Sequence, residues 1–147
     1  MATEWQRGGY TITTNAEQFD IHVIHGYLSG SSYWAEGRPM EVVRRSIENS
    51  LAFGVFKGAA QIGFARVITD YATFAWLADV FVLPEHRSAG IGTWLMEVIV
   101  GHPQLQGLRR WMLVTADAHG LYAKFGFTPL DGPERFMERF ADNHPGA

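Results

Sequence analysis

The feature that most constrains this chain is a strand, loop and helix start near its middle. An almost unbroken apolar run from Phe74 to Val82 leads into a short loop with two glycines, and a helical pattern runs from Thr93 to Val100. The run has the length and composition of a buried strand, and Pro84 ends it. The free N–H groups of such a loop and of the first helical turn point toward one place, where the helix dipole favours an anion. The sequence therefore predicts a phosphate-binding loop.

The loop itself has a distinctive glycine spacing. It reads Val82-Leu83-Pro84-Glu85-His86-Arg87-Ser88-Ala89-Gly90-Ile91-Gly92. Gly90 and Gly92 carry no Cβ, so a ligand can approach the backbone closely. The pattern Arg-x-x-Gly-x-Gly lacks the Gly-Lys-Ser/Thr of a P-loop, and its glycines are too few for the dinucleotide-binding fingerprint. The loop therefore indicates anion binding of another type.

Two segments together resemble the GNAT superfamily of N-acetyltransferases. Residues 82–92 are similar to its acetyl-coenzyme A signature, Val-x-Pro-x-x-Arg-x-x-Gly-Ile-Gly. Residues 121–127, Leu-Tyr-Ala-Lys-Phe-Gly-Phe, are similar to its second signature, Leu-Tyr-x-Lys-x-Gly-Phe. The two stand in the family's order and about the family's distance apart. The resemblance covers residues 10–140, most of the chain.

Length and composition indicate one folded domain over residues 1–147, with a core at 10–140 and short flexible termini. Apolar residues make up 47% and charged residues 18%, which is typical of a globular core. A net charge of −3 does not indicate a nucleic-acid binder, and the absence of cysteine excludes a thiol nucleophile. We expect a cytoplasmic protein without membrane contact, because no signal-peptide core and no run of about 18 apolar residues occur.

The order of elements predicts an α+β fold. The expected strands are 10–14, 51–57, 61–69, 73–82, 109–115, 127–130 and 135–140. The expected helices are 21–28, capped by Asp20, then 40–49, a helix from just after Gly90 to 100, and one from 117 to 125, capped by Asp117. The resemblance implies a single-domain GNAT fold: a mixed, mostly antiparallel sheet with helices on both faces. It also implies that strands 73–82 and 109–115 split apart and admit coenzyme A.

By the same resemblance, the cofactor lies along strand 73–82 and the glycine loop. The pyrophosphate would bind the backbone N–H groups of the loop, the pantetheine arm would pair with the strand, and the N–H of Val82 would bond the thioester carbonyl. The implied cofactor-binding residues are Phe81, Val82, Arg87, Ser88, Ala89, Gly90, Ile91, Gly92, Thr93 and Tyr122. Ser88 stands where the family very often has glycine, and Thr115 stands where it often has asparagine.

Amide formation from a thioester needs a neutral amine, a donor for the oxyanion and a proton for the leaving thiolate. Tyr122 matches the family tyrosine that protonates the thiolate, and a phenol with a reference pKa of about 10 is protonated at neutral pH. The alternative is an aromatic residue that only packs.

We expect Asp79 to be the base, because it lies in an apolar strand where desolvation would raise its pKa. Period two places it on the same side as Leu77 and Phe81. A structural role for this carboxylate, His25 or Glu41 as the base, and attack without a base remain alternatives.

The acceptor side is expected in residues 20–50. His25, Tyr33 and Trp34 are the candidate substrate-binding residues, although Tyr33 and Trp34 in the loop 30–39 are as well explained by packing at the edge of the core. His22 and His25 share a helix face, but no further ligands are apparent nearby, so no metal site is predicted.

The sequence as a whole favours an N-acetyltransferase that uses acetyl-coenzyme A and acts on a primary amine of a small molecule or peptide. The alternative is a non-catalytic module with the same fold that senses acyl-coenzyme A. A hydrolase is not supported, since neither Gly-x-Ser-x-Gly nor His-Glu-x-x-His occurs. Homodimers are common in the family, so a homodimer is one expected state of this chain.

Overall fold

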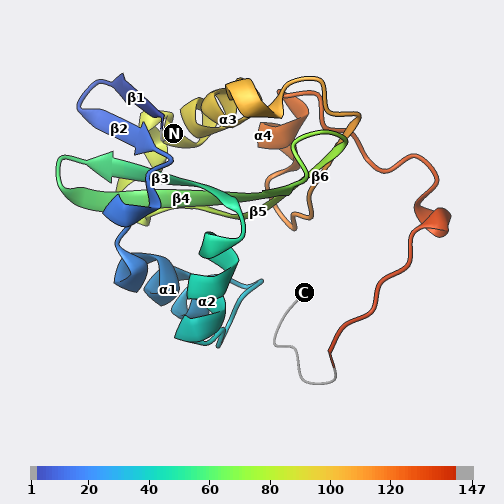
Figure 1. Cartoon of the computed structure of the whole chain (residues 1–147), viewed down its shortest axis with the longest axis horizontal. Helices are drawn as coiled ribbons and strands as arrows, with labels where there is room; N and C mark the ends of the chain where they lie inside the picture. The colour runs from blue at the N-terminus through green and yellow to red at the C-terminus, as the bar shows by residue number, and fades with distance from the viewer. Residues whose placement is uncertain (1–2, 142–147) are drawn as a thin grey trace.

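A computed structural model describes residues 3–141 of the chain (Figure 1). The strands are β1 (Glu4–Arg7), β2 (Tyr10–Thr13), β3 (Leu51–Lys57), β4 (Ala60–Thr69), β5 (Phe74–Val82) and β6 (Arg110–Met112). They form one sheet in the order β1-β2-β3-β4-β5-β6. Neighbouring strands are antiparallel except β5 and β6, which are parallel. The predicted mixed, mostly antiparallel sheet is confirmed.

Helices cover both faces of this sheet. The α-helices are α1 (Ile21–Gly30), α2 (Met40–Glu48), α3 (Ile91–Val100) and α4 (His119–Ala123), and the 3₁₀ helices are η1 (Ala16–Gln18), η2 (Pro84–Ala89), η3 (Pro103–Leu105) and η4 (Pro133–Arg135). In Figure 1, α1 and α2 lie below the sheet and α3 and α4 lie above it. Each face has its own buried apolar cluster. The chain therefore has two cores separated by the sheet.

The helix signals in the sequence have their expected physical basis. The Asp20 carboxylate accepts hydrogen bonds from the first free N–H groups of α1, so it caps that helix as predicted. Ile91, Leu95 and Val98 are buried along one side of α3, which is the face that packs on the sheet. None of the helices within residues 3–141 is long and apolar enough to cross a membrane.

Strand β5 contains a β-bulge at Asp79. The β4–β5 register shifts between Phe64 and Arg66, and Asp79 adopts the left-handed conformation with φ of 55°. Leu77 therefore packs in the cluster with α3, while Phe81 packs in the cluster with α1. The prediction that Leu77, Asp79 and Phe81 share a face was wrong, because period two holds only where no residue is inserted.

Other differences lie at the two ends of the chain. The sequence pattern missed β1, a mostly exposed polar strand that forms a hairpin with β2. The expected strand 109–115 is limited to Arg110–Met112, and 127–130 and 135–140 are not strands, since none of the residues 113–141 belongs to one. Alternation alone cannot make a strand without a neighbour that pairs with it. The C-terminal tail that was expected to be flexible, from Asp142 on, lies outside the described residues.

Candidate active site

Strands β5 and β6 separate partway along β5. Their pairs are Phe74 with Arg110, Ala75 with Trp111 and Trp76 with Met112. Beyond Trp76, strand β5 continues to Val82 with no β6 residue beside it. The structure therefore has the expected opening between these two strands, and one edge of β5 lines it.

The main chain of Val82 faces this opening. The Leu83 N–H donates to the Ile62 carbonyl at 2.8 Å, so these two residues form a hydrogen-bonded pair. Pairs of the two types alternate along antiparallel strands, so the next pair, Val82 with Gly63, is a non-hydrogen-bonded pair. The backbone N–H and C=O groups of Val82 therefore point away from β4. Arg87 Nε donates to the Val82 carbonyl at 2.9 Å. The Val82 N–H is therefore directed toward the opening.

The glycine loop leads from β5 into an uncapped helix. Residues 87–90 are exposed, and Gly90 adopts φ of 75°, a conformation that a residue with a Cβ rarely takes. Gly90 is also the N-cap residue of α3, where no side chain caps the helix. The N–H groups of the first turn are therefore presented at an open surface, as an anion site requires.

Arg87 is held beside helix α1. Its Nη2 donates to the Tyr27 hydroxyl at 2.8 Å, and the Tyr27 ring stacks on Phe81 with centroids 4.2 Å apart. A surface cavity of about 520 Å³ lies here, lined by His22, Val23, Gly26, Tyr27, Ser31, Leu83, Pro84 and Arg87. The sequence analysis missed Tyr27, because no local pattern links a helix residue to a loop sixty positions later.

Tyr122 is a buried residue of α4. Burial raises its pKa to about 12, and the nearby Tyr33 and Asp117 contribute to the same shift. Its ring packs against Phe127 at 6.0 Å. The phenol is therefore protonated at neutral pH, which is the state that a proton donor needs.

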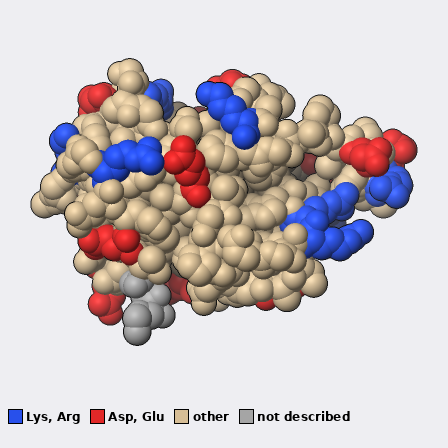
Figure 2. Space-filling view, turned by 90° about the horizontal axis from the view of Figure 1, so that it is seen from above, with Lys and Arg blue, Asp and Glu red and all other residues tan. Residues whose placement is uncertain are grey.

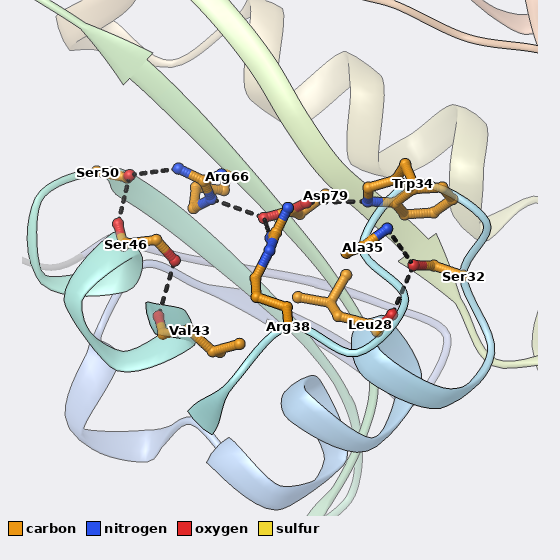
Figure 3. A network of polar contacts seen from close by, with 10 residues as sticks. All are labelled: Leu28, Ser32, Trp34, Ala35, Arg38, Val43, Ser46, Ser50, Arg66 and Asp79. Atoms are coloured by element: carbon orange, nitrogen blue, oxygen red, sulfur yellow. Dashed lines mark hydrogen bonds and ion pairs between the residues drawn. The ribbon is translucent and has the colours of Figure 1, made fainter. Parts of the chain in front are cut away.

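Asp79 is at the centre of a buried polar network on the α1–α2 side of the sheet (Figure 3). Its Oδ2 accepts from Arg38 Nη1 and from Arg66 Nε, both at 2.8 Å. Its Oδ1 accepts from Trp34 Nε1 at 2.9 Å, and Arg66 also donates to Ser50 Oγ at 3.2 Å. With 3% of its side chain exposed, Asp79 anchors the loop 30–39 onto β4 and β5.

The three candidate bases all have partners. Both oxygens of Asp79 are engaged by the network described above. His25 Nε2 lies 3.0 Å from the Arg38 carbonyl, so this nitrogen must carry the proton and donate. Glu41 is exposed and lies 3.6 Å from Arg45 on the same helix. The identity of the base stays a prediction.

Residues 3–141 contain no group of three or more His, Cys, Asp or Glu side chains that could hold a metal ion.

The loop 30–39 links the acceptor-side residues to the region beyond β6. The Ala116 N–H donates to the Tyr33 hydroxyl at 2.8 Å, and Tyr33 packs edge-on against Trp34 at 5.1 Å. Trp34 in turn bonds Asp79, and Tyr33 is near enough to Tyr122 to affect its pKa. Ala116, Tyr33, Trp34 and Asp79 are thus joined by one chain of contacts.

The two arginines of the network were not recognised as site residues in the sequence. Arg66 is a charged residue inside the otherwise apolar strand β4, and Asp79 is the charged residue inside the adjacent β5. Lone opposite charges in paired apolar strands are a usable signal, because a buried charge needs a partner. Arg38 comes from a loop, and its approach to Asp79 could be read only from the tertiary structure.

A family profile of the acetyltransferase (GNAT) domain matches residues 48–129. The chain belongs to the GNAT acetyltransferase family. A provisionally named acetyltransferase of Gibberella zeae is 31% identical over 142 residues, covering 82% of this chain and 79% of that protein. A crystal structure of a GNAT-family protein from Xanthomonas campestris pv. campestris has a TM-score of 0.90 and 50% identity, and the match covers 96% of this chain and 97% of that one.

The same GNAT fold occurs in a crystal structure that contains acetyl-coenzyme A. It is a protein from Clostridium acetobutylicum described as a predicted acetyltransferase, with a TM-score of 0.63, 16% identity, and coverage of 95% of this chain and 96% of that one. In the present GNAT chain, the second signature forms α4 and its end, where Gly126 adopts the expected left-handed conformation. The predicted cap was wrong: Ala118 is the N-cap residue, and the Thr115 hydroxyl accepts from the N–H groups of Asp117 and Ala118.

Proposed function

We propose that this GNAT chain transfers an acetyl group from acetyl-coenzyme A to a primary amine of a small molecule or peptide, by direct attack in a ternary complex. The observation that carries the proposal is the opening beside β5. There, β5 ends at Val82, whose N–H faces the opening, and the chain continues directly into the exposed glycine loop and the uncapped start of α3. The Clostridium structure with acetyl-coenzyme A supports this choice of co-substrate.

The chemistry assigns a role to each part of the opening. The loop N–H groups hold the pyrophosphate, and the Val82 N–H stabilises the oxyanion as the amine nitrogen attacks the thioester carbon. When the carbon–sulfur bond breaks, Tyr122 donates its proton to the sulfur, the nitrogen releases its extra proton to water, and the Tyr122 phenolate takes a proton back from water before the next turnover. Its raised pKa keeps that proton in place until the thiolate forms.

The local charge bears on how the amine loses its proton. Two guanidinium groups surround the single carboxylate of Asp79, so the network carries a net positive charge. A positive environment disfavours an ammonium group and favours the neutral, nucleophilic amine. We propose that Asp79 positions Arg38 and Trp34 at the acceptor side, and that proton loss from the amine does not require this carboxylate as the direct base.

Thermal unfolding with and without acetyl-coenzyme A tests the cofactor site first. A ligand at about 100 times its dissociation constant stabilises by roughly 2.7 kcal/mol, so we expect a shift of roughly 5–10 °C at about 2–4 °C per kcal/mol. Gly90→Glu should abolish the shift. Gly107→Glu is the matched control, because both glycines have φ near 75° and nothing within 4 Å of an added Cβ.

Turnover then separates catalysis from the non-catalytic alternative. Thioester consumption across a panel of primary amines supports the proposal, and Tyr122→Phe should lower kcat by about 100-fold or more. A ligand-dependent shift without turnover on any amine would favour the sensor module. No shift at millimolar acetyl-coenzyme A would refute the cofactor site. Ser88→Gly would then be the first variant to test for recovery of binding.

A further inference from the structure

The buried network around Asp79 holds more positive than negative charge. Arg38 and Arg66 donate to the same carboxylate oxygen, Oδ2 of Asp79, each at 2.8 Å. The two donor nitrogens therefore lie no farther apart than twice that distance. Among the ion pairs of residues 3–141, these two arginines share only this carboxylate. Two positive groups and one negative group leave one positive charge uncompensated.

This excess charge is unusual because it is shielded from water. The side chains of Arg66 and Arg38 are 11% and 22% exposed, whereas that of Arg45 on α2 is 72% exposed. Figure 2 shows the ordinary case: on the face seen from above, basic and acidic side chains are scattered over the surface, where water solvates them. A charge removed from water needs a partner of opposite sign. The network therefore favours the binding of an additional anion.

The two guanidinium groups have donors left for such an anion. Arg38 donates to Asp79 through Nη1, and Arg66 uses Nε and Nη1 for Asp79 and Ser50. In the described part of the chain, no side-chain nitrogen is both buried and without a hydrogen-bond partner, so the remaining nitrogens of these arginines reach solvent. Arginine presents its N–H donors in a planar fork that matches the geometry of a carboxylate.

The backbone of Arg38 is fixed by contacts within its own loop and with α1. Its N–H donates to the Ala35 carbonyl at 3.0 Å, and its carbonyl accepts from His25 Nε2 at 3.0 Å. Ala35 is buried, and its N–H donates to Ser32 Oγ at 3.1 Å (Figure 3). An arginine supported in this way loses less conformational freedom when it binds an anion than one on a mobile loop. The loop 30–39 therefore holds Arg38 in a preorganised position.

The network lies close to the place where the acceptor amine must react. Asp79 and Val82 are three residues apart on β5, which is about 10 Å at about 3.3 Å per residue. Trp34 bonds Asp79 and packs edge-on against Tyr33. The Tyr33 hydroxyl accepts from the Ala116 N–H beyond β6. The loop that carries both aromatic residues thus contacts both sides of the opening between β5 and β6.

We propose that the acceptor is a primary amine that also carries a carboxylate, and that Arg38 binds this carboxylate. The inference rests on the proposed function, because it places the amine at the thioester beside Val82 and the carboxylate at the guanidinium groups beside Asp79. The charge of the carboxylate offsets the excess positive charge of the network. A diamine is disfavoured, because its second ammonium group meets that positive charge.

Acetylation of a series of ω-amino acids tests this proposal. The series runs from glycine to 6-aminohexanoic acid, and each acid is compared with its neutral amide after correction for the fraction of neutral amine. Release of the coenzyme A thiol can be followed with a thiol reagent, because the chain contains no cysteine. For at least one length, kcat/KM should be about 10–100-fold higher for the acid, mainly through a lower KM.

A pair of lysine peptides distinguishes the two sources of such a carboxylate. The peptides differ only by glutamate or glutamine beside the lysine. A preference for the glutamate peptide alone assigns the carboxylate to a peptide acceptor, and a preference among the amino acids alone assigns it to a small molecule. Either result supports the role of Arg38.

Variants of the arginine identify the group that reads the carboxylate. Arg38→Met should bring acid and amide to equal kcat/KM, and Arg38→Lys should restore part of the preference. Arg45→Met is the matched control, because it also removes one arginine charge but from an exposed position paired with Glu41, so it should leave the preference intact. The ratio of acid to amide is measured within each variant, so a partial loss of folded protein does not change it.

Equal kcat/KM for acid and amide at every length and in the peptides overturns the proposal, as does an Arg38→Met variant with the wild-type ratio. Acetylation of the amides without any preference leaves the proposed transferase function standing and refutes only the carboxylate site. If no amine consumes the thioester, calorimetric binding of the same acids and amides decides. Acids that bind at least about 10-fold more tightly support the site, and equal or absent binding overturns it.

Discussion

Replacing Asp79 by asparagine should destabilise the fold by about 3 kcal/mol, because it leaves two arginines without their shared carboxylate. Truncating one partner of a buried ion pair costs about 3–5 kcal/mol. The side chains of Arg66 and Arg38 are 11% and 22% exposed, so water can compensate partly and the lower end of that range applies. At about 2–4 °C per kcal/mol, the melting temperature should fall by roughly 6–12 °C.

Two further variants separate charge from backbone strain. Asparagine tolerates the left-handed φ of 55° at position 79, whereas alanine does not. Asp79→Ala should therefore cost about 1 kcal/mol more than Asp79→Asn. Adding Arg66→Met to Asp79→Asn removes one of the unpaired charges and should recover part of the loss.

Urea unfolding followed by tryptophan fluorescence measures these differences. A loss below about 1 kcal/mol for Asp79→Asn, with an unchanged dependence on urea, would refute the argument that Asp79 neutralises the arginines. Equal losses for the asparagine and alanine variants would refute the strain argument.

Kinetics of Asp79→Asn at a temperature where the variant is folded then test the role of Asp79 in the site. A positioning role predicts mainly a raised KM for the acceptor, whereas a direct base predicts a lowered kcat and the loss of an acidic limb in the pH profile.

Two other changes have outcomes that follow from single observations. The pKa of Tyr122 is about 12 in the folded protein and about 10 in the unfolded chain, so the neutral phenol stabilises the fold below pH 10 and that contribution is lost as the pH rises toward 12. Tyr122→Phe should therefore flatten the fall in unfolding free energy over this range, and an unchanged slope would contradict the burial argument. A Cβ at Gly54 would lie 2.7 Å from the Phe19 ring, so Gly54→Ala should lower the unfolding free energy by about 1–3 kcal/mol. Gly120→Ala, which meets nothing within 4 Å, should be neutral or stabilising in the same denaturation assay.

Local sequence patterns predicted the central part of the fold well. The apolar run 74–82, the proline after it and the two glycines specify a strand, a loop and a helix start, because each depends on backbone conformations set within a few residues. The cap at Asp20 and the buried face of α3 were predictable for the same reason. The resemblance supplied the split sheet, which periodicity alone does not indicate.

Features that depend on a distant partner were not predictable in this way. The bulge at Asp79 follows from the register between β4 and β5, and it reversed the side on which Phe81 packs. The pattern at 135–140 resembles a strand, but none of the described residues 113–141 belongs to one.

The sequence by itself thus determined where a strand gives way to a glycine-containing loop, and which side chains of α3 must be buried, since local conformational preference and apolar periodicity govern both. Only the tertiary structure decided what Asp79 does. Its carboxylate meets Arg66 from the adjacent strand and Arg38 and Trp34 from the loop 30–39, and contacts between segments that far apart arise only when the whole chain folds.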